Sequence, residues 1–275
     1  MVPRPYRGAL TARTQSADAR SVVRNFGTSE VGSITPGLRT YGGSVPPMTE
    51  AVFDSRPWIL PVCNQKGGSG KTTTALNLAA VIADSSGRVR VYDADPQQSA
   101  TEIAGAIEGG APFEILDGLR PDALARLPEL RGFDTVLIDC AGNLQDTPLL
   151  AEVLAVADFA LIPMVPERAC VVPTLKTARV VAASGIPYRI VLTMCDPLRG
   201  PGPVIAARQL LDDEGVPYFR SFIRRKVAFP QSQLDGVLLP AYRGDRSWRD
   251  ALDDVRKVQT ELLLELGRIG AQASA

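Results

Sequence analysis

The stretch Cys63–Thr73 reads Cys-Asn-Gln-Lys-Gly-Gly-Ser-Gly-Lys-Thr-Thr. An apolar run at residues 58–62 precedes it, and a pattern typical of a helix follows at residues 75–82. Glycines let several backbone N–H groups turn towards one anion, and a helix that starts there adds the positive end of its dipole. Strand, glycine-rich loop and helix in this order therefore predict a site for phosphate groups.

Two side chains in this stretch carry the expected chemistry. Lys71 is placed to reach the β- and γ-phosphates of a nucleotide, and the Thr72 hydroxyl to hold Mg²⁺. The other residues expected to hold the nucleotide are Gly67, Gly68, Ser69, Gly70 and Thr73. The loop departs from the common pattern, because Gln65 replaces the usual glycine and is followed by Lys66. An ordinary glycine-rich turn is the alternative, but the flanking strand and helix favour binding of ATP and Mg²⁺.

The composition is that of a globular protein with a sizeable core: the 275 residues are 45% hydrophobic and carry no formal net charge. No bulk charge therefore draws the chain to DNA or to a membrane. Histidine is absent, which excludes histidine general bases and Ser-His-Asp triads. The four cysteines form no Cys-x-x-Cys motif, and we interpret them as buried thiols rather than iron–sulfur or zinc ligands. Without a signal-like or long uncharged apolar segment, we expect a cytoplasmic protein.

The first part of the chain differs from the rest. Residues 1–55 are rich in Gly, Pro, Ser, Thr and Arg, and we expect them to be mostly disordered, with a short helix at residues 17–26. Their arginines outnumber their acidic residues, so weak DNA contact is the functional alternative to a solvated tail.

Residues 56–270 alternate short apolar runs with helical patterns. This alternation predicts an α/β fold, a three-layer, mostly parallel, twisted sheet flanked by helices. The expected strands are 58–62, 89–92, 113–116, 135–138, 159–163, 188–194 and 218–223, and the expected helices are 75–82, 98–107, 121–130, 149–156, 173–183, 204–213 and 248–269. Ligands bind beyond the carboxyl ends of the strands in such sheets, so residues at those ends are candidates for the site.

Three carboxylates follow predicted strands at that edge. Asp139 ends an apolar strand, as a Mg²⁺-holding aspartate does, and the expected metal ligands are Thr72, Asp93 and Asp139. Asp95 is expected to orient the attacking water. Its alternative role is to cap the following helix, because Asp95 and Gln98 have the spacing of a capping box.

Segments spread along the chain carry a family resemblance. They are Lys-Gly-Gly-Ser-Gly-Lys-Thr-Thr at 66–73, Asp-Ala-Asp-Pro-Gln at 93–97, Leu-Ile-Asp at 137–139, Leu-Ile-Pro-Met-Val-Pro at 161–166, Leu-Thr-Met-Cys-Asp at 192–196 and Phe-Ile-Arg-Arg-Lys-Val at 222–227. Together they resemble the ParA/MinD ATPases with a deviant Walker A loop, over residues 57–266. Asp-Cys-Ala-Gly at 139–142 and Gln-Leu-Asp-Gly at 233–236 are most similar to ParF-like partition ATPases of the ParA type. Cys140 and Ala141 depart from the family, in which prolines often follow this aspartate.

The resemblance implies that residues 56–270 are a P-loop ATPase domain of the ParA type. Members of this family carry a signature lysine that crosses to the partner's nucleotide, and Lys66 stands at that position. The implied catalytic residues are therefore Lys66, Lys71 and Asp95. Met194 and Asp196 belong to the segment that is expected near the adenine. The implied cofactors are ATP and Mg²⁺, and ATP is expected to close a sandwich homodimer.

The function that the resemblance implies is DNA partition. The dimer would bind DNA without sequence preference on the nucleoid, and hydrolysis stimulated by a ParB- or ParG-like cargo-binding partner would release it. The basic run Arg224, Arg225 and Lys226 is expected to contact DNA, with a solvated charged face as the alternative.

Other functions remain open at this stage. One is a ParA-like ATPase that positions a protein assembly, and others are a MinD-like membrane ATPase, a metal-carrying or electron-transfer relative and a small-molecule kinase. Residues 267–275 are small and nearly uncharged, unlike the basic amphipathic tail that membrane binding requires, so we expect no membrane partner. The unpaired cysteines argue against a metal carrier, and the signature lysine argues against a small-molecule kinase.

Overall fold

The computed structural model describes residues 56–142, 148–244 and 246–273. The strands are β1 (Trp58–Val62), β2 (Val89–Ala94), β3 (Glu114–Asp117), β4 (Thr135–Cys140), β5 (Ala160–Met164), β6 (Tyr188–Cys195) and β7 (Tyr218–Arg224). The α-helices are α1 (Lys71–Asp84), α2 (Ser99–Gly105), α3 (Pro148–Val156), α4 (Arg168–Ala183), α5 (Gly202–Asp213), α6 (Ala228–Leu234) and α7 (Trp248–Ala273), and the 3-10 turns include η2 (Leu127–Glu129) and η4 (Pro197–Arg199). The expectations for residues 1–55 lie outside the described residues.

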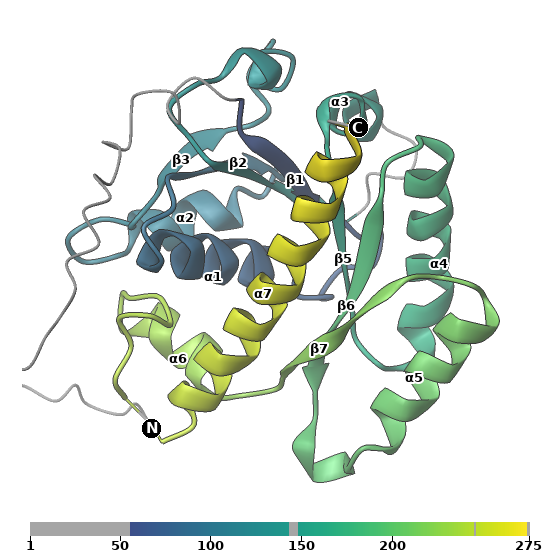
Figure 1. Ribbon diagram of the computed structural model, residues 1–275. Helices are drawn as coiled ribbons and strands as arrows, with labels where there is room; N and C mark the ends of the chain where they lie inside the picture. The colour runs from purple at the N-terminus through teal and green to yellow at the C-terminus, as the bar shows by residue number, and fades with distance from the viewer. Residues whose placement is uncertain (1–55, 143–147, 245, 274–275) are drawn as a thin grey trace, which may run out of the picture. The chain divides into compact units, whose positions relative to one another are not determined.

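The strands form one twisted sheet with helices on both of its faces (Figure 1). Their order is β3-β2-β4-β1-β5-β6-β7, and each strand is parallel to its neighbours. The predicted α/β fold class is confirmed, and the described sheet is parallel throughout.

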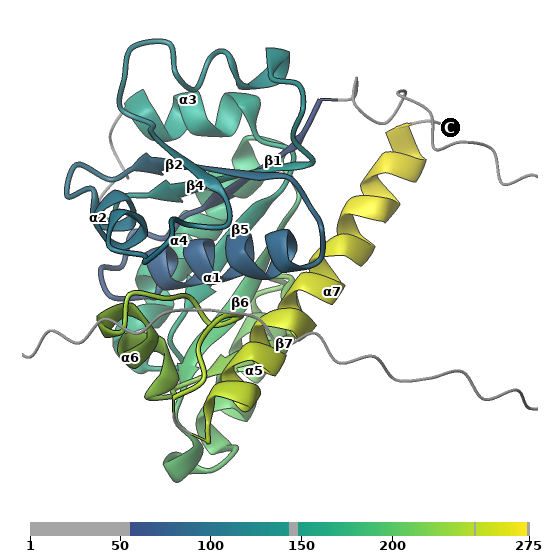
Figure 2. The same ribbon diagram turned by 90° about the vertical axis from the view of Figure 1, so that its left-hand side faces the viewer.

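Two hydrophobic cores hold the helices to the sheet. α1, α2, α6 and α7 cover one face, whereas α3, α4 and α5 cover the other, as Figure 2 shows from a second direction. β4 is buried along its whole length because helices pack on both of its sides. This burial explains why the strands read as continuous apolar runs rather than as alternating ones.

The position of β1 in the sheet fixes the position of the phosphate-binding loop. β1 lies between β4 and β5, with α1 following it towards one face of the sheet and α3 following β4 towards the other. Neighbouring strands whose helices leave in opposite directions open a crevice at their carboxyl ends. The loop after β1 and the residues that end β4 therefore meet in one crevice.

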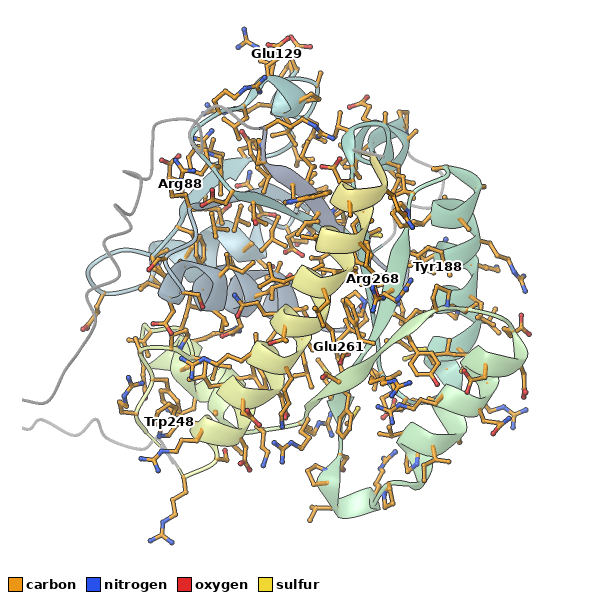
Figure 3. All side chains as sticks on the ribbon, viewed as in Figure 1. Arg88, Glu129, Tyr188, Trp248, Glu261 and Arg268 are labelled. Atoms are coloured by element: carbon orange, nitrogen blue, oxygen red, sulfur yellow. The ribbon has the colours of Figure 1, made fainter. Side chains whose placement is uncertain are left out.

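α7 protects the β7 edge of the sheet. The Glu261 carboxylate accepts hydrogen bonds from the backbone N–H groups of Arg220 (2.8 Å) and Ser221 (2.6 Å). Figure 3 shows Glu261 on α7 where the helix passes that strand. The Asp254 carboxylate likewise accepts the N–H of Arg224 (2.9 Å) and pairs with its guanidinium. Free N–H groups on an edge strand invite pairing with other chains, so these acids keep the edge closed.

The predicted helix at residues 121–130 is wrong. Turns fill this span with a single 3-10 turn, η2, and Asp122 has a left-handed backbone with φ of 63°. That conformation interrupts a right-handed helix. The buried side chains of Leu124 and Leu127 anchor the segment to the core that it shares with α3.

Two other helices differ from expectation. α4 begins at Arg168 rather than at Pro173, which lies inside the helix. The sequence does not predict α6, because seven residues are too few for a periodic hydrophobic pattern. No helix in the described part of the chain is long and apolar enough to cross a bilayer.

Replacing Asp254 with alanine should lower the free energy of unfolding by about 2–4 kcal/mol, because it removes the nearer and more buried of the two aspartates that pair with the partly buried Arg224 guanidinium. Asp253→Ala is the matched control, since its pair with Lys257 is exposed, and its cost should stay within about 0.5 kcal/mol. Urea unfolding followed by circular dichroism measures both. Equal losses in the two variants would contradict the role of Asp254 as the anchor between α7 and β7.

Candidate functional site

The loop between β1 and α1 forms the centre of the site. Its backbone is left-handed at Gly68 (φ 73°) and at Gly70 (φ 85°), a conformation that glycine adopts without strain. Gly70 is the N-cap of α1, and a side chain added there would lie 3.5 Å from the Met194 methyl group. A glycine-rich loop at the positive end of a 14-residue helix is an anion-binding arrangement.

Lys71 opens α1 and is buried, with 7% of its surface exposed. Its Nζ donates a hydrogen bond to the carbonyl of Lys66 at 3.3 Å, so the side chain folds back across its own loop. Burial lowers the pKa of Lys71, and the negative charges of Asp139 and Asp95 oppose that shift. A buried ammonium that bonds only weakly within the loop is suited to pair with phosphate oxygens.

Asp139 is the next-to-last residue of β4 and pairs in register with Val62, the last residue of β1. Its carboxylate is buried. Neither of its oxygens makes a hydrogen bond of ordinary geometry among the described residues. Burial raises the pKa of Asp139 to about 7, while the nearby Thr72 hydroxyl and the charge of Lys71 hold it from rising further. A buried carboxylate with free oxygens beside a hydroxyl fits a divalent cation with oxygen ligands, such as Mg²⁺.

Asp93 lies beside Asp139 in the sheet, but its oxygens are engaged within the fold. Oδ2 accepts hydrogen bonds from the N–H (2.8 Å) and the hydroxyl (2.9 Å) of Thr101, and Oδ1 accepts the N–H of Asp95 (3.2 Å). Asp93 therefore holds the first turn of α2 against the end of β2. Of the two neighbouring aspartates, Asp139 is the one whose oxygens are free to meet a cation.

Asp95 closes a turn at the same edge. Its Oδ1 accepts the N–H of Gln97 at 2.9 Å. The N-cap of α2 is Gln98, so the alternative role of Asp95 as the helix cap is wrong. Asp95 is near enough to Lys71 and Asp139 for its charge to raise the pKa of both groups. The structure thus brings together Lys71, Thr72, Asp95 and Asp139, as the sequence predicts.

Gly142 passes directly against the loop. A side chain built on it would come within 3.2 Å of the Lys71 Nζ and 3.3 Å of the Gly67 Cα. Cys140 and Ala141, where the sequence departs from the family, are buried in the core on the α3 side. The close approach to the loop therefore favours glycine at position 142, whereas Cys140 and Ala141 fill space in the core.

Two tethers that the sequence does not reveal hold the loop in place. On the helix side, the Thr193 hydroxyl of β6 donates a hydrogen bond to the carbonyl of Ser69 at 2.8 Å. On the strand side, the buried Asn64 side chain accepts the N–H of Lys66 at 2.9 Å. Single polar residues at the ends of strands carry no periodic signal, so only their position beside the loop could have indicated them.

A cavity of about 520 Å³ opens beside the loop. It is lined by Gly70, Thr73, Thr74, Thr193, Met194, Ile223, Arg224, Arg225, Lys226, Val227, Phe229, Pro230 and Gln233. Largely apolar walls next to an anion-binding loop suit the base and sugar of a nucleotide. Met194, from the segment expected near the adenine, lines this cavity, and its contact with the adenine stays a prediction. Asp196 does not line this cavity, because it accepts the N–H of Leu198 (2.9 Å) and caps η4.

In the basic run at the end of β7, two residues form ion pairs with α7 and the third is exposed. The Arg224 guanidinium pairs with Asp254 (2.8 Å), and the Lys226 ammonium pairs with Asp250 (2.8 Å), both on α7. Arg225 is exposed, and no ion pair engages it within the described residues. Two of the three residues expected to contact DNA therefore hold α7 to the sheet.

The sequence of this chain matches a family of known proteins. The family model described as "CobQ/CobB/MinD/ParA nucleotide binding domain" matches residues 60–239. This chain belongs to that family. The ParA/MinD-type P-loop ATPase family that the sequence predicts is thereby confirmed.

Two relatives of this ParA/MinD-type chain differ in how much of their length they share with it. The chain is 37% identical over 209 residues to "Maintenance of carboxysome distribution protein A" of Gloeobacter kilaueensis, covering 76% of this chain and 95% of that protein. It is also 35% identical over 138 residues to "Chromosome-partitioning ATPase Soj" of Thermus thermophilus, covering 39% of this chain and 55% of that protein. Among solved structures, a Cyanothece McdA variant in complex with ATP superposes with a TM-score of 0.61 at 20% identity, covering 76% of this chain and 97% of that one. That superposition supports the fold.

In the absence of nucleotide and Mg²⁺, Asp139→Asn should raise the free energy of unfolding at pH 8 by about 1–3 kcal/mol relative to the wild type. The folded carboxyl keeps its proton up to about pH 7, whereas an ordinary aspartate loses it near 3.8, so wild-type stability falls as the pH rises between these values. The asparagine cannot ionise and should remove that fall. Urea unfolding of both proteins at pH 5 and pH 8 measures the difference in unfolding free energy between the variant and the wild type. The same difference at both pH values would contradict a strongly raised pKa of Asp139.

Proposed function

We propose that this chain is an ATPase that positions a protein assembly inside the cell. The observation that carries the proposal is the relative named for carboxysome distribution, which is 37% identical and is covered over 95% of its length. The match to the chromosome-partitioning relative spans only 55% of that protein. Positioning of an assembly is therefore favoured over the DNA partition that the sequence motifs alone imply.

The proposed reaction is hydrolysis of ATP, with transfer of the γ-phosphoryl group to water. The buried Lys71 would pair with the phosphates, and the loop N–H groups would hold them in line. Thr72 and Asp139 would hold Mg²⁺, which neutralises phosphate charge when bound. Asp95, with a carboxylate at the same edge, would orient the attacking water.

Lys66 is proposed to act on a second subunit. It stands at the start of the loop, and no ion pair holds its side chain among the described residues. A lysine that reaches the phosphates of a facing subunit would supply charge to the transition state in the way of an arginine finger. This role makes each site incomplete without a partner, so ATP binding would close a homodimer whose hydrolysis a cargo-bound partner protein stimulates.

The track along which the assembly would move is proposed to be non-specific DNA on the nucleoid. Arg225 is the exposed cation of the basic run, and Arg243, Arg246 and Arg249 are also exposed close to it in sequence. The formal net charge is zero, so one subunit offers a small patch, and a dimer would double the phosphates that it neutralises. DNA affinity would then depend on ATP and fall steeply with salt.

Deletion of the gene in its host should collapse the distribution of one protein assembly while plasmids and chromosomes are inherited at the wild-type frequency. The assembly is followed by fluorescence microscopy after tagging the product of the neighbouring gene. Restoration by the wild-type gene but not by a Lys71→Ala variant would tie the effect to nucleotide binding. Loss of a plasmid or chromosome with all tagged assemblies evenly spaced would contradict the proposal and favour DNA partition.

A further inference from the structure

Asn64 joins β1, β5, α4 and the phosphate-binding loop through one buried side chain, of which 2% is exposed. Its Nδ2 donates hydrogen bonds to the carbonyl of Pro163 (2.7 Å) and to the Thr174 hydroxyl (2.8 Å). Its Oδ1 accepts the backbone N–H of Lys66 at 2.9 Å. The carbonyl can only accept and the N–H can only donate, so these partners fix the orientation of the amide.

Two threonines of α4 complete the cluster. The Thr177 hydroxyl accepts the N–H of Gln65 at 3.1 Å and donates to the carbonyl of Pro173 at 3.0 Å. The Thr174 hydroxyl accepts from Asn64 and donates to the carbonyl of Cys170 at 2.7 Å. Each hydroxyl therefore gives its proton to its own helix and receives one from the loop side. Thr174 and Thr177 are almost fully buried, so water cannot replace these contacts.

The cluster holds the backbone on which Lys66 stands, and it is separate from the contacts that hold the phosphate side of the loop. The N–H groups of Gln65 and Lys66 are both bound to it. The carbonyl of Ser69 is tied instead to Thr193 of β6. Loss of the α4 contacts would therefore loosen the Lys66 end of the loop while the Ser69 end keeps its own anchor.

We propose that Asn64, Thr174 and Thr177 are positioning residues that set Lys66 for catalysis across the dimer and couple its position to α4. The proposal rests on the proposed role of Lys66. None of the three residues needs to touch the nucleotide, because they act through the backbone at 65–66. The Lys71 ammonium bonds the Lys66 carbonyl only at 3.3 Å, and Thr193 holds the Ser69 carbonyl separately. A displacement of α4 would therefore move Lys66 more than Lys71, so α4 is the element through which hydrolysis can be regulated.

The test compares Thr177→Val with Thr177→Ser. Valine has the shape of threonine but cannot accept the N–H of Gln65, so turnover should fall about tenfold, while the Kd for ATP stays within about threefold. Serine keeps the hydroxyl and should restore turnover to within about twofold of the wild type. Asn64→Asp is the second variant, because a carboxylate oxygen facing the Pro163 carbonyl breaks the same cluster. Phosphate release and fluorescent ATP titration provide the two readouts.

Thr260→Val is the matched control. The Thr260 hydroxyl donates to the carbonyl four residues earlier in α7, as Thr177 does in α4, but it lies on the exposed side of that helix. It should leave turnover unchanged. Thermal unfolding of every variant shows whether a loss of turnover reflects a loss of the folded protein.

A double variant separates failure of this inference from failure of the proposed function. If single-turnover measurement detects a residual rate in Lys66→Ala and Thr177→Val lowers that residual rate no further, the two residues act together. If Lys66→Ala abolishes turnover but Thr177→Val alone has no effect, the positioning role is overturned and the role of Lys66 stands. If Thr177→Val weakens ATP binding as much as it slows turnover, the cluster shapes the whole loop and the inference is also overturned. Normal turnover by Lys66→Ala overturns the role of Lys66 itself.

Discussion

The interaction on which the site depends is a buried ammonium placed beside a buried carboxylate. Lys71 begins α1 and Asp139 lies at the carboxyl end of β4, and they come close because β1 and β4 are neighbours in the sheet. Burial lowers the pKa of the lysine and raises that of the aspartate to about 7, so the pair is poorly stabilised by its own mutual attraction. The phosphates of a bound nucleotide would pair with the Lys71 ammonium, and a divalent cation would pair with the Asp139 carboxylate. Burial of these two groups thus lowers the stability of the fold and prepares a site for a nucleotide.

The loop around this pair is held at both ends by different elements. Thr193 of β6 ties the carbonyl of Ser69, and Asn64 ties the N–H of Lys66 to β5 and α4. The first anchor lies next to the cavity proposed for the nucleoside, and the second lies on the face of the sheet that α4 covers. In the proposed function, this division would allow ATP binding and ATP hydrolysis to respond to different parts of the molecule. An ATPase that must hold ATP until a partner arrives needs such a separation.

The sequence predicts the fold and the charged centre of the site because both depend on strong local patterns. Apolar runs locate the strands, and the spacing of glycines and lysines locates the loop. It does not predict the Asn64 cluster, because Thr174 and Thr177 meet Asn64 only after α4 packs on the sheet. The pairing of Arg224 with Asp254 is missed for the same reason, since 30 residues separate them in the chain. The helix expected at 121–130 fails because the left-handed Asp122 interrupts it.

In the proposed function, each ATP is hydrolysed with a lysine from the opposite subunit. This role of Lys66 is tested most directly by mixing two inactive variants, Lys66→Ala and Asp95→Ala, and measuring phosphate release. In a mixed dimer, the Lys66→Ala subunit keeps its own Asp95 and receives Lys66 from its partner, so one of the two sites is complete. Random mixing of equal amounts should therefore restore about a quarter of the wild-type rate. A mixture as inactive as the separate variants would show that Lys66 does not act across the interface and would contradict the account.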